Sequence, residues 1–135
     1  LSTTMVKAAR RRNKAAIEAG RVTLLMGDVE ALPFAGEQFD KIFSIHTFYF
    51  WPEPLHIIEE LSRILRPDGM LMLTLSSGTT SPSGHCTYGP LQATLEQRII
   101  PGLQQMGFAS ASLQAGPDSR RYTHVAMVAR KRPVA

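Results

Sequence analysis

Three short apolar runs, each ended by turn residues, constrain the fold of this sequence most. Val22–Met26 is continuous rather than alternating in polarity, which is typical of a strand buried on both faces of a parallel sheet. Lys41–Ile45 and Met70–Leu75 predict a second and a third buried strand. Between these two, Pro52 and Pro54 open an amphipathic stretch, and a helix there supplies the crossover that parallel strands require. The pattern predicts a layered α/β sheet.

The other segments have the capping residues, turns and periodicity of helices and of a terminal hairpin. They predict a helix over 4–19 capped by Ser2 or Thr3 and ended by Gly20, a helix from Pro54 stopped at Pro67–Gly69, a helix over 90–106 bent at Pro101 and ended by Gly107, and strands over 109–114 and 122–130. The predicted fold is one α/β domain with parallel strands, helical crossovers and an antiparallel edge hairpin.

Composition excludes several other classes of protein. The 135 residues are 44% hydrophobic and 19% charged, the profile of one globular unit rather than a disordered or fibrous chain. Cys86 is the single cysteine, so no disulfide forms within the chain and no zinc cluster is expected. The sequence therefore predicts a reducing, cytoplasmic compartment. No apolar run approaches the roughly 18 residues of a membrane helix, and no membrane association is expected.

The two ends of the chain are basic, whereas the middle is acidic. Residues 1–21 carry six basic side chains against Glu18, and residues 118–135 carry five against Asp118. Arg10–Arg12 with Lys14 offers a contact for nucleic acid. No aromatic residue interleaves with this run, as a platform for stacked bases requires. The interpretation favoured is a solvated helix face without nucleic-acid binding.

Ligands of open α/β sheets bind beyond the carboxyl ends of the strands, where three groups of residues stand. Asp28 can accept hydrogen bonds from an exocyclic amine beside a backbone amide, or serve as a turn residue. His46–Trp51 carries aromatic side chains suited either to a ligand or to core packing. Ser76–Tyr88, which contains His85, can form a substrate-facing wall or a plain connector.

The order and spacing of these features match a known family. The stretch VTLLMGDVEALPFAGEQFDKIFSIHTFYFWPEPLHIIEELSRILRPDGMLMLTL, residues 22 to 75, resembles class I S-adenosylmethionine-dependent methyltransferases of the small-molecule "type 11" group. Gly107-Phe108 before the terminal hairpin is similar to the ending of that family. The resemblance implies a Rossmann-like methyltransferase sheet, S-adenosylmethionine as cofactor and a small-molecule acceptor.

The resemblance also implies roles for individual residues. Asp28 matches the acidic residue that accepts from the adenine amino group, Val29 the amide that meets the ring, and Met5 an apolar wall of the adenine pocket. Six cofactor-binding residues are implied in all: Met5, Asp28, Val29, Ser44, Ile45 and His46. Tyr49 occupies a position that faces cofactor and acceptor in relatives. Tyr49 and His85 are the predicted substrate-binding residues, and no residue is assigned as catalytic.

The family's first strand, glycine-rich loop and second strand have no counterpart in these 135 residues. The sequence therefore predicts a single, partial methyltransferase domain over residues 1–135, truncated at its N-terminal side. The first hypothesis is methyl transfer to a small molecule, with this chain supplying the adenine-side and acceptor-side half. The alternative is a non-catalytic remnant that acts as an interaction module and forms a homodimer through an exposed sheet edge.

Overall fold

The computed structural model describes residues 2–79, 89–116 and 122–135. The chain divides into two compact units, Leu1–Pro33 and Phe34–Ala135. The predicted helices and the hairpin lie within these units.

The first unit contains a short helix pair followed by an irregular segment. Helix α1 spans Thr3–Arg12 and α2 spans Lys14–Glu18. The Ser2 hydroxyl accepts a hydrogen bond from the Met5 amide at 3.3 Å, so Ser2 rather than Thr3 is the N-cap. Asn13 interrupts the single helix predicted over 4–19, because its side-chain amide and its backbone N–H both donate to the Ala9 carbonyl. Gly20 ends α2 with φ +68°, as predicted.

The strand predicted over Val22–Met26 is wrong. The segment has no regular secondary structure, and the bridge that follows it joins only Asp28 to Ala31. A strand exists through its ladder of hydrogen bonds to a neighbour. None of the described residues provides that neighbour for Val22–Met26, so its apolar side chains are left half-buried or exposed, as Leu25 and Met26 are at 56% each.

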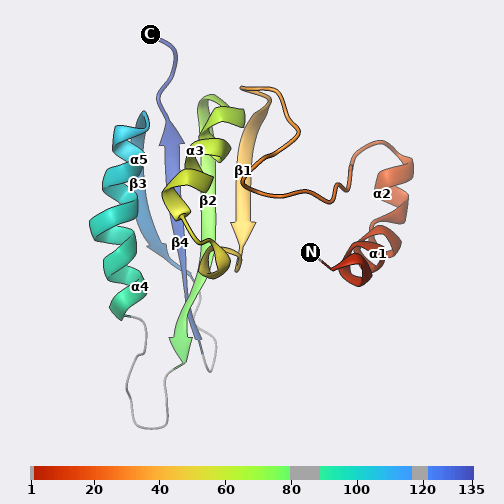
Figure 1. Ribbon diagram of the computed structural model, residues 1–135, viewed down its shortest axis with the longest axis horizontal. Helices are drawn as coiled ribbons and strands as arrows, with labels where there is room; N and C mark the ends of the chain where they lie inside the picture. The colour runs from red at the N-terminus through yellow and green to blue at the C-terminus, as the bar shows by residue number, and fades with distance from the viewer. Residues whose placement is uncertain (1, 80–88, 117–121) are drawn as a thin grey trace. The chain divides into compact units, whose positions relative to one another are not determined.

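The second unit is a four-stranded sheet with helices packed on one face (Figure 1). Its elements are β1 Phe39–Ile45, the 3-10 turn η1 Phe48–Phe50, α3 Pro54–Ile64, β2 Leu65–Thr79, α4 Gly89–Thr94, the π-helix η2 Leu95–Ile99, α5 Ile100–Gln105, β3 Phe108–Ala115 and β4 Tyr122–Lys131. The strand order is β1-β2-β4-β3. The β1–β2 pair is parallel and β4 is antiparallel to both β2 and β3.

This architecture confirms the predicted α/β fold with its helical crossover and antiparallel hairpin. Helix α3 connects the parallel strands and ends at Ile64, before the predicted stop at Pro67. Alternate residues of β2 point to opposite faces, and Leu71, Leu73 and Leu75 are fully buried on the face that the helices cover. The core is completed by the apolar stripe of α3, by η2 and α5, and by β4. Its other fully buried large side chains are Ile57, Ile58, Leu65, Leu95, Ile99, Leu103, Phe108 and Met127.

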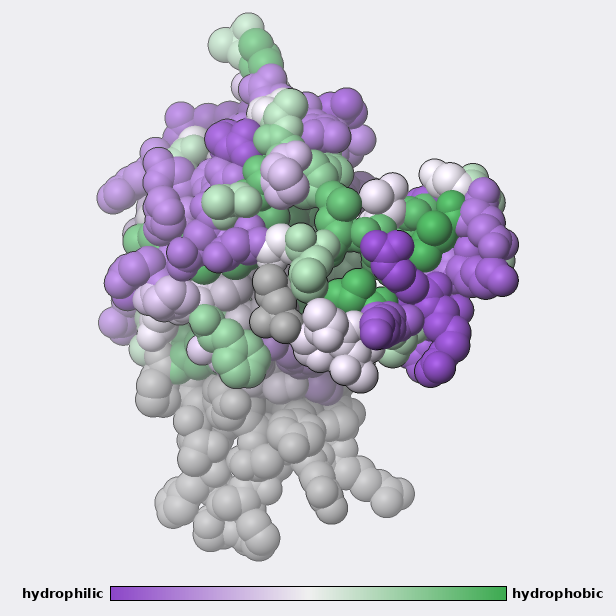
Figure 2. All heavy atoms as spheres, turned by 45° about the vertical axis from the view of Figure 1, so that its right-hand side comes forward, coloured by the Kyte–Doolittle hydropathy of each residue, from purple (hydrophilic) through white to green (hydrophobic). Residues whose placement is uncertain are grey.

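Strand β1 lies at the edge of the sheet, so the prediction of full burial for Lys41–Ile45 is wrong. Among the described residues, β1 pairs with β2 alone. Phe43 is 66% exposed and Ile45 is 54% exposed. Figure 2 shows hydrophobic side chains at the surface among hydrophilic ones on the side it presents. Within the described residues, β1 is therefore an edge strand that exposes Phe43 and Ile45 and has one row of backbone groups without a strand partner.

The helix predicted to bend at Pro101 is built from three segments, α4, η2 and α5. Pro101 has no amide hydrogen, and its ring clashes with the carbonyl four residues earlier in a regular α-helix. Widening the preceding turn to a π-helix over Leu95–Ile99 relieves that clash. Gly107 follows with φ +94° and leads directly into β3.

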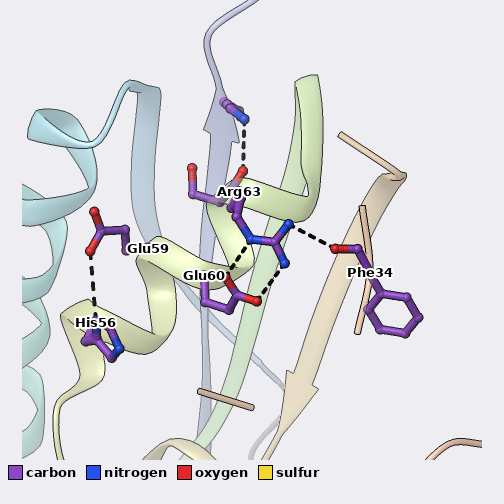
Figure 3. A network of polar contacts seen from close by, with 7 residues as sticks. Phe34, His56, Glu59, Glu60 and Arg63 are labelled. Atoms are coloured by element: carbon purple, nitrogen blue, oxygen red, sulfur yellow. Dashed lines mark hydrogen bonds and ion pairs between the residues drawn. The ribbon is translucent and has the colours of Figure 1, made fainter. Parts of the chain in front are cut away.

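Figure 3 shows how Arg63 connects the end of α3 to the segment before β1. Its guanidinium donates to the Phe34 carbonyl at 2.9 Å and to both carboxylate oxygens of Glu60 at 2.7 Å. The hydrogen bond with Glu60 raises the pKa of Arg63 above its ordinary value. The backbone continues the connection, since the Glu37 amide donates to the Arg63 carbonyl at 3.0 Å. These contacts hold the segment that leads into β1 against the C-terminal end of α3.

Candidate functional site

The carboxyl end of β1 makes a sharp turn at His46. The His46 amide still donates to the Thr74 carbonyl of β2 at 2.9 Å, but its φ of +54° takes the chain out of the strand. This left-handed conformation is uncommon for a residue with a side chain. Ser44 and Thr47 are hydrogen-bonded to each other through their hydroxyls across this turn. The predicted cofactor residues Ser44, Ile45 and His46 thus lie at one strand exit.

Tyr49 connects this turn to the end of β2. Its hydroxyl donates to the Ser76 carbonyl at 3.1 Å and accepts from the Ser76 amide. Both polar groups of the Ser76 backbone are therefore held by one side chain from η1. Tyr49 also stacks on His46, with 6.4 Å between the ring centroids and 10° between the ring planes. Tyr49, predicted to bind substrate, has its hydroxyl engaged within the protein.

The Ser76 side chain continues the cluster to β4. Ser76 and His124 are directly opposite in the antiparallel register, and the Ser76 hydroxyl lies 3.2 Å from His124 Nδ1. The imidazole rings of His124 and His46 have centroids 6.1 Å apart. Side chains from the turn after β1, from η1, from β2 and from β4 therefore meet at one end of the sheet, where ligands of α/β folds bind.

His124 is the residue of this cluster that sequence reasoning missed. It lies 48 residues from Ser76, and the antiparallel pairing of β4 beside β2 brings them together. The sequence held part of this information, because His124 lies close to the first residue of the strand predicted over 122–130. This strand was expected to belong to a hairpin at the edge of the sheet. In the structure it is β4, which lies inside the sheet between β2 and β3, so its pairing with β2 was not predicted.

The remaining predicted cofactor residues belong to the first unit. The Asp28 side chain accepts a hydrogen bond from the Glu30 amide at 3.0 Å through Oδ1, an Asx turn. Its second oxygen has no partner within the described ranges, nor has the Val29 amide. Met5 is 67% exposed on α1. His85 lies outside the described residues.

Charged networks gather at the opposite end of the strands. Arg130 of β4 makes two hydrogen bonds to Asp68, at 2.7 and 2.9 Å. Arg66 contacts Asp40 at 2.9 Å. The hydrogen bond from Arg130 lowers the pKa of Asp68 below its ordinary value, and the same contact raises the pKa of Arg130.

In the part of the chain that is described, no group of three or more His, Cys, Asp or Glu side chains could hold a metal ion. No helix there is long and apolar enough to span a membrane.

Comparison with known proteins places this chain in a family. The family profile described as "Methyltransferase domain" matches residues 1–73, more than half of the chain. The chain belongs to the methyltransferase domain family. This confirms the family resemblance identified from residues 22 to 75.

Two relatives and one solved structure illustrate the extent of the similarity. The chloroplastic 2-methyl-6-phytyl-1,4-hydroquinone methyltransferase 2 of Oryza sativa subsp. japonica is 39% identical over 59 residues, which are 44% of this chain and 16% of the relative. The uncharacterized methyltransferase YdaC of Bacillus subtilis (strain 168) is 24% identical over 116 residues, which are 84% of this chain and 58% of the relative.

The solved structure is a SAM-dependent methyltransferase from Aquifex aeolicus. It superimposes with a TM-score of 0.68 at 20% identity, and the similarity covers 96% of this chain and 64% of that chain. The methyltransferase domain described here therefore has the Rossmann-like methyltransferase fold. The chain spans less than two thirds of the length of each of these three proteins.

Proposed function

We propose that this methyltransferase domain takes part in methyl transfer from S-adenosylmethionine to a small-molecule acceptor. Family membership supports the cofactor, and the side chains at the strand ends support a site on the acceptor side. The proposal assigns Met5, Asp28 and Val29 to the adenine moiety, and Ser44, Ile45 and His46 to the methionine moiety.

The single observation that supports the proposal most directly is the chemistry at Asp28 and Val29. An adenine ring presents an amino group that donates beside a ring nitrogen that accepts. Asp28 offers a carboxylate oxygen without a partner among the described residues, and the next residue offers an amide hydrogen in the same condition. The carboxylate of Asp28 can therefore accept from the adenine amino group, and the adjacent Val29 amide can donate to the neighbouring ring nitrogen. Met5, exposed on α1, is an apolar side chain suited to packing against a flat ring.

Bound S-adenosylmethionine supplies a methyl group that is already activated by its positively charged sulfur. The task of the chain is then alignment and the exclusion of water. The Ser44–Thr47 hydroxyl pair and the His46 turn form the strand exit that we assign to this purpose.

A small-molecule acceptor fits the aromatic surface beside that exit. Phe50 is 81% exposed and lies edge-on to Tyr49, with 6.3 Å between ring centroids. The relative from Oryza sativa is named for a hydroquinone that carries methyl and phytyl groups, and the ring of a hydroquinone is flat and aromatic. We assign acceptor binding to Tyr49 and to His85, which lies outside the described residues.

Asp28 provides the test of cofactor binding. Calorimetry with S-adenosylhomocysteine is expected to show an affinity 5- to 150-fold weaker for Asp28→Ala, the equivalent of about 1–3 kcal/mol for a hydrogen bond to a charged group. Asp28→Asn separates the two roles of the residue, because the amide oxygen preserves the turn to Glu30 but the carboxylate is lost. We expect Asp28→Asn to bind nearly as weakly as Asp28→Ala.

Glu30→Ala is the matched control, since it removes a neighbouring carboxylate without disturbing either role of Asp28. Its affinity should equal that of the unmodified chain. Full affinity in Asp28→Asn together with a loss in Asp28→Ala would assign Asp28 to the turn and refute its role toward adenine.

The free edge of β1 favours a second candidate function, an interaction module that forms a homodimer. Phe43 and Ile45 are exposed on the edge strand, and such edges pair readily with another copy of themselves. Sedimentation velocity over a range of concentrations tests this candidate. A dimer that persists on dilution and whose sedimentation is unchanged by S-adenosylhomocysteine supports this candidate, whereas a monomer argues against it.

We also propose a cytoplasmic location and no binding of nucleic acid. Cys86 as the single cysteine is consistent with a reducing compartment. Arg10–Arg12 lie in the last turn of α1, where positively charged side chains interact favourably with the helix dipole. This interaction accounts for the basic run without a nucleic-acid ligand. Cell fractionation tests the first proposal. A gel-shift titration with duplex DNA and single-stranded RNA tests the second, and a shift at physiological salt would refute it.

A further inference from the structure

Three polar side chains share one face and one end of the sheet in the second unit. Leu75 is buried on the face covered by helices, so the next residue, Ser76, points to the opposite face. His124 faces the same way because it is paired directly with Ser76. His46 follows β1 and lies 6.1 Å from His124 between ring centroids. Phe43 is paired with Met72, which lies between the buried Leu71 and Leu73 and so points to this same face. Imidazole and hydroxyl groups therefore meet on the face that carries the exposed Phe43.

The imidazole of His124 is oriented by a defined set of contacts. Nδ1 is held by the Ser76 hydroxyl at 3.2 Å, and the Ser76 backbone is fixed on both sides by Tyr49. In the described part of the chain, Nε2 has no hydrogen-bond partner, and the residue is half-buried. When the hydroxyl accepts from Nδ1–H, Nε2 carries a lone pair. A base oriented by a second group is the arrangement that acid–base catalysis requires.

The other candidates for such a base, Tyr49 and His46, lack, in the part of the chain that is described, either a free polar atom or a hydrogen bond that orients the ring. The Tyr49 hydroxyl is committed to the backbone of Ser76. The His46 ring makes aromatic contacts, but no hydrogen bond within the described residues orients it. Among the described residues of the cluster, His124 alone combines an oriented ring with an open nitrogen.

We propose that His124 is the general base of the methyl transfer and that Ser76 is its positioning residue. The inference rests on the proposed function and deepens it, because a base is needed only when the attacking atom must lose a proton. Among acceptors that must lose a proton, the proposal selects hydroxyl compounds, and the exposed ring of Phe50 beside Tyr49 favours a phenol.

The bonds and charges of this step balance. The phenolic oxygen uses an electron pair to form its bond to the methyl carbon, while its O–H proton moves to Nε2 of His124. The bond from the methyl carbon to sulfur breaks, and its electron pair remains on sulfur and cancels the positive charge there. The products are a methyl ether, a neutral thioether and an imidazolium, which returns its proton to water.

Imidazole nitrogen NMR of the ¹⁵N-labelled 135-residue chain tests the positioning role without requiring turnover. His124 is expected to populate one tautomer, protonated on Nδ1, and Ser76→Ala is expected to convert it to a mixture. His56, exposed on α3 beside Glu59, is the internal reference whose signals should not change. Identical His124 spectra in the two chains would overturn the assignment of Ser76.

Titration with 4-nitrophenol, whose colour reports its ionised fraction, tests the base and the acceptor class. Binding should shift the imidazole signals of His124 but not those of His56, and bound 4-nitrophenol should be more ionised on the unmodified chain than on His124→Asn. His56→Asn is the matched control and should behave as the unmodified chain. Unshifted His124 signals, or equal ionisation on His124→Asn, would overturn the proposal.

Turnover and cofactor binding separate this inference from the proposed function. With a phenol as methyl acceptor, His124→Asn should lower kcat by about 10²- to 10⁴-fold while the affinity for S-adenosylhomocysteine stays unchanged. Methylation of benzoate in preference to phenols would overturn the acceptor class, since a carboxylate has no proton to lose. Failure of the unmodified chain to bind S-adenosylhomocysteine refutes the proposed function alone, because the 4-nitrophenol titration needs no cofactor.

Discussion

Residues 22–26 and 70–75 are both short apolar runs, yet only the second is a strand. Met70–Leu75 hydrogen-bonds to β1 on one side and to β4 on the other, and Leu71, Leu73 and Leu75 are fully buried. Val22–Met26 has no ladder, and no described residue of the first unit is buried. Similar local composition therefore gives opposite outcomes. The difference shows that a strand depends on its partners as much as on its own side chains.

Matched leucine substitutions give the largest expected difference between the two regions. Leu73→Ala leaves a cavity in the core and should lower the free energy of unfolding by about 2–5 kcal/mol. Leu25→Ala, at a side chain that is 56% exposed, should change it by less than about 0.5 kcal/mol. Denaturant titration of both variants measures the contrast. Equal losses would mean that Leu25 packs in solution as a core residue does.

The cap of α1 sharpens the comparison at an intermediate magnitude. Ser2→Ala removes the hydroxyl that accepts from Met5 and should destabilise the helix by about 0.5–2 kcal/mol. Because the second unit has its own core, amide exchange in α1 should accelerate while exchange in β2 stays unchanged. Thr3→Ala is the control, as Thr3 lies within the helix. Faster exchange in β2 would show that the units are coupled in stability.

The smallest expected effect is the pH dependence of the Asp68–Arg130 pair in the second unit. Since folding lowers the pKa of Asp68, its contribution to stability is present above the ordinary aspartate range and is lost as pH falls through the lowered value. Asp68→Asn should thus flatten the acid side of the stability profile, and Arg130→Gln should do the same. Asn also tolerates the φ of +61° at this position. An unchanged acid slope in both variants would contradict the role of the pair.

Sequence reasoning succeeded where local signals and tertiary partners agree. The apolar stripe and opening prolines of α3, the ends at Gly20 and Gly107, and the two strands of the terminal hairpin all have local causes. These elements lie close to their predicted positions.

The failures concern information that lies far away in the sequence. Whether Val22–Met26 forms a ladder depends on other strands, and the burial of β1 depends on what covers it. The interruption at Asn13 depends on a side-chain bond that competes with the backbone. His124 enters the site through pairing across 48 residues, which no local pattern encodes. Elements were therefore easier to predict than the cluster they assemble.

The left-handed backbone of His46 decides how its side chain should be removed in a mutational study. At φ +54°, alanine retains the steric conflict between its Cβ and the backbone, whereas glycine has none. Alanine scanning at this turn measures the loss of the imidazole together with the strain on whatever replaces it. His46→Gly, compared with His46→Asn as a polar residue that tolerates the conformation, separates the contribution of the ring from that of the bend.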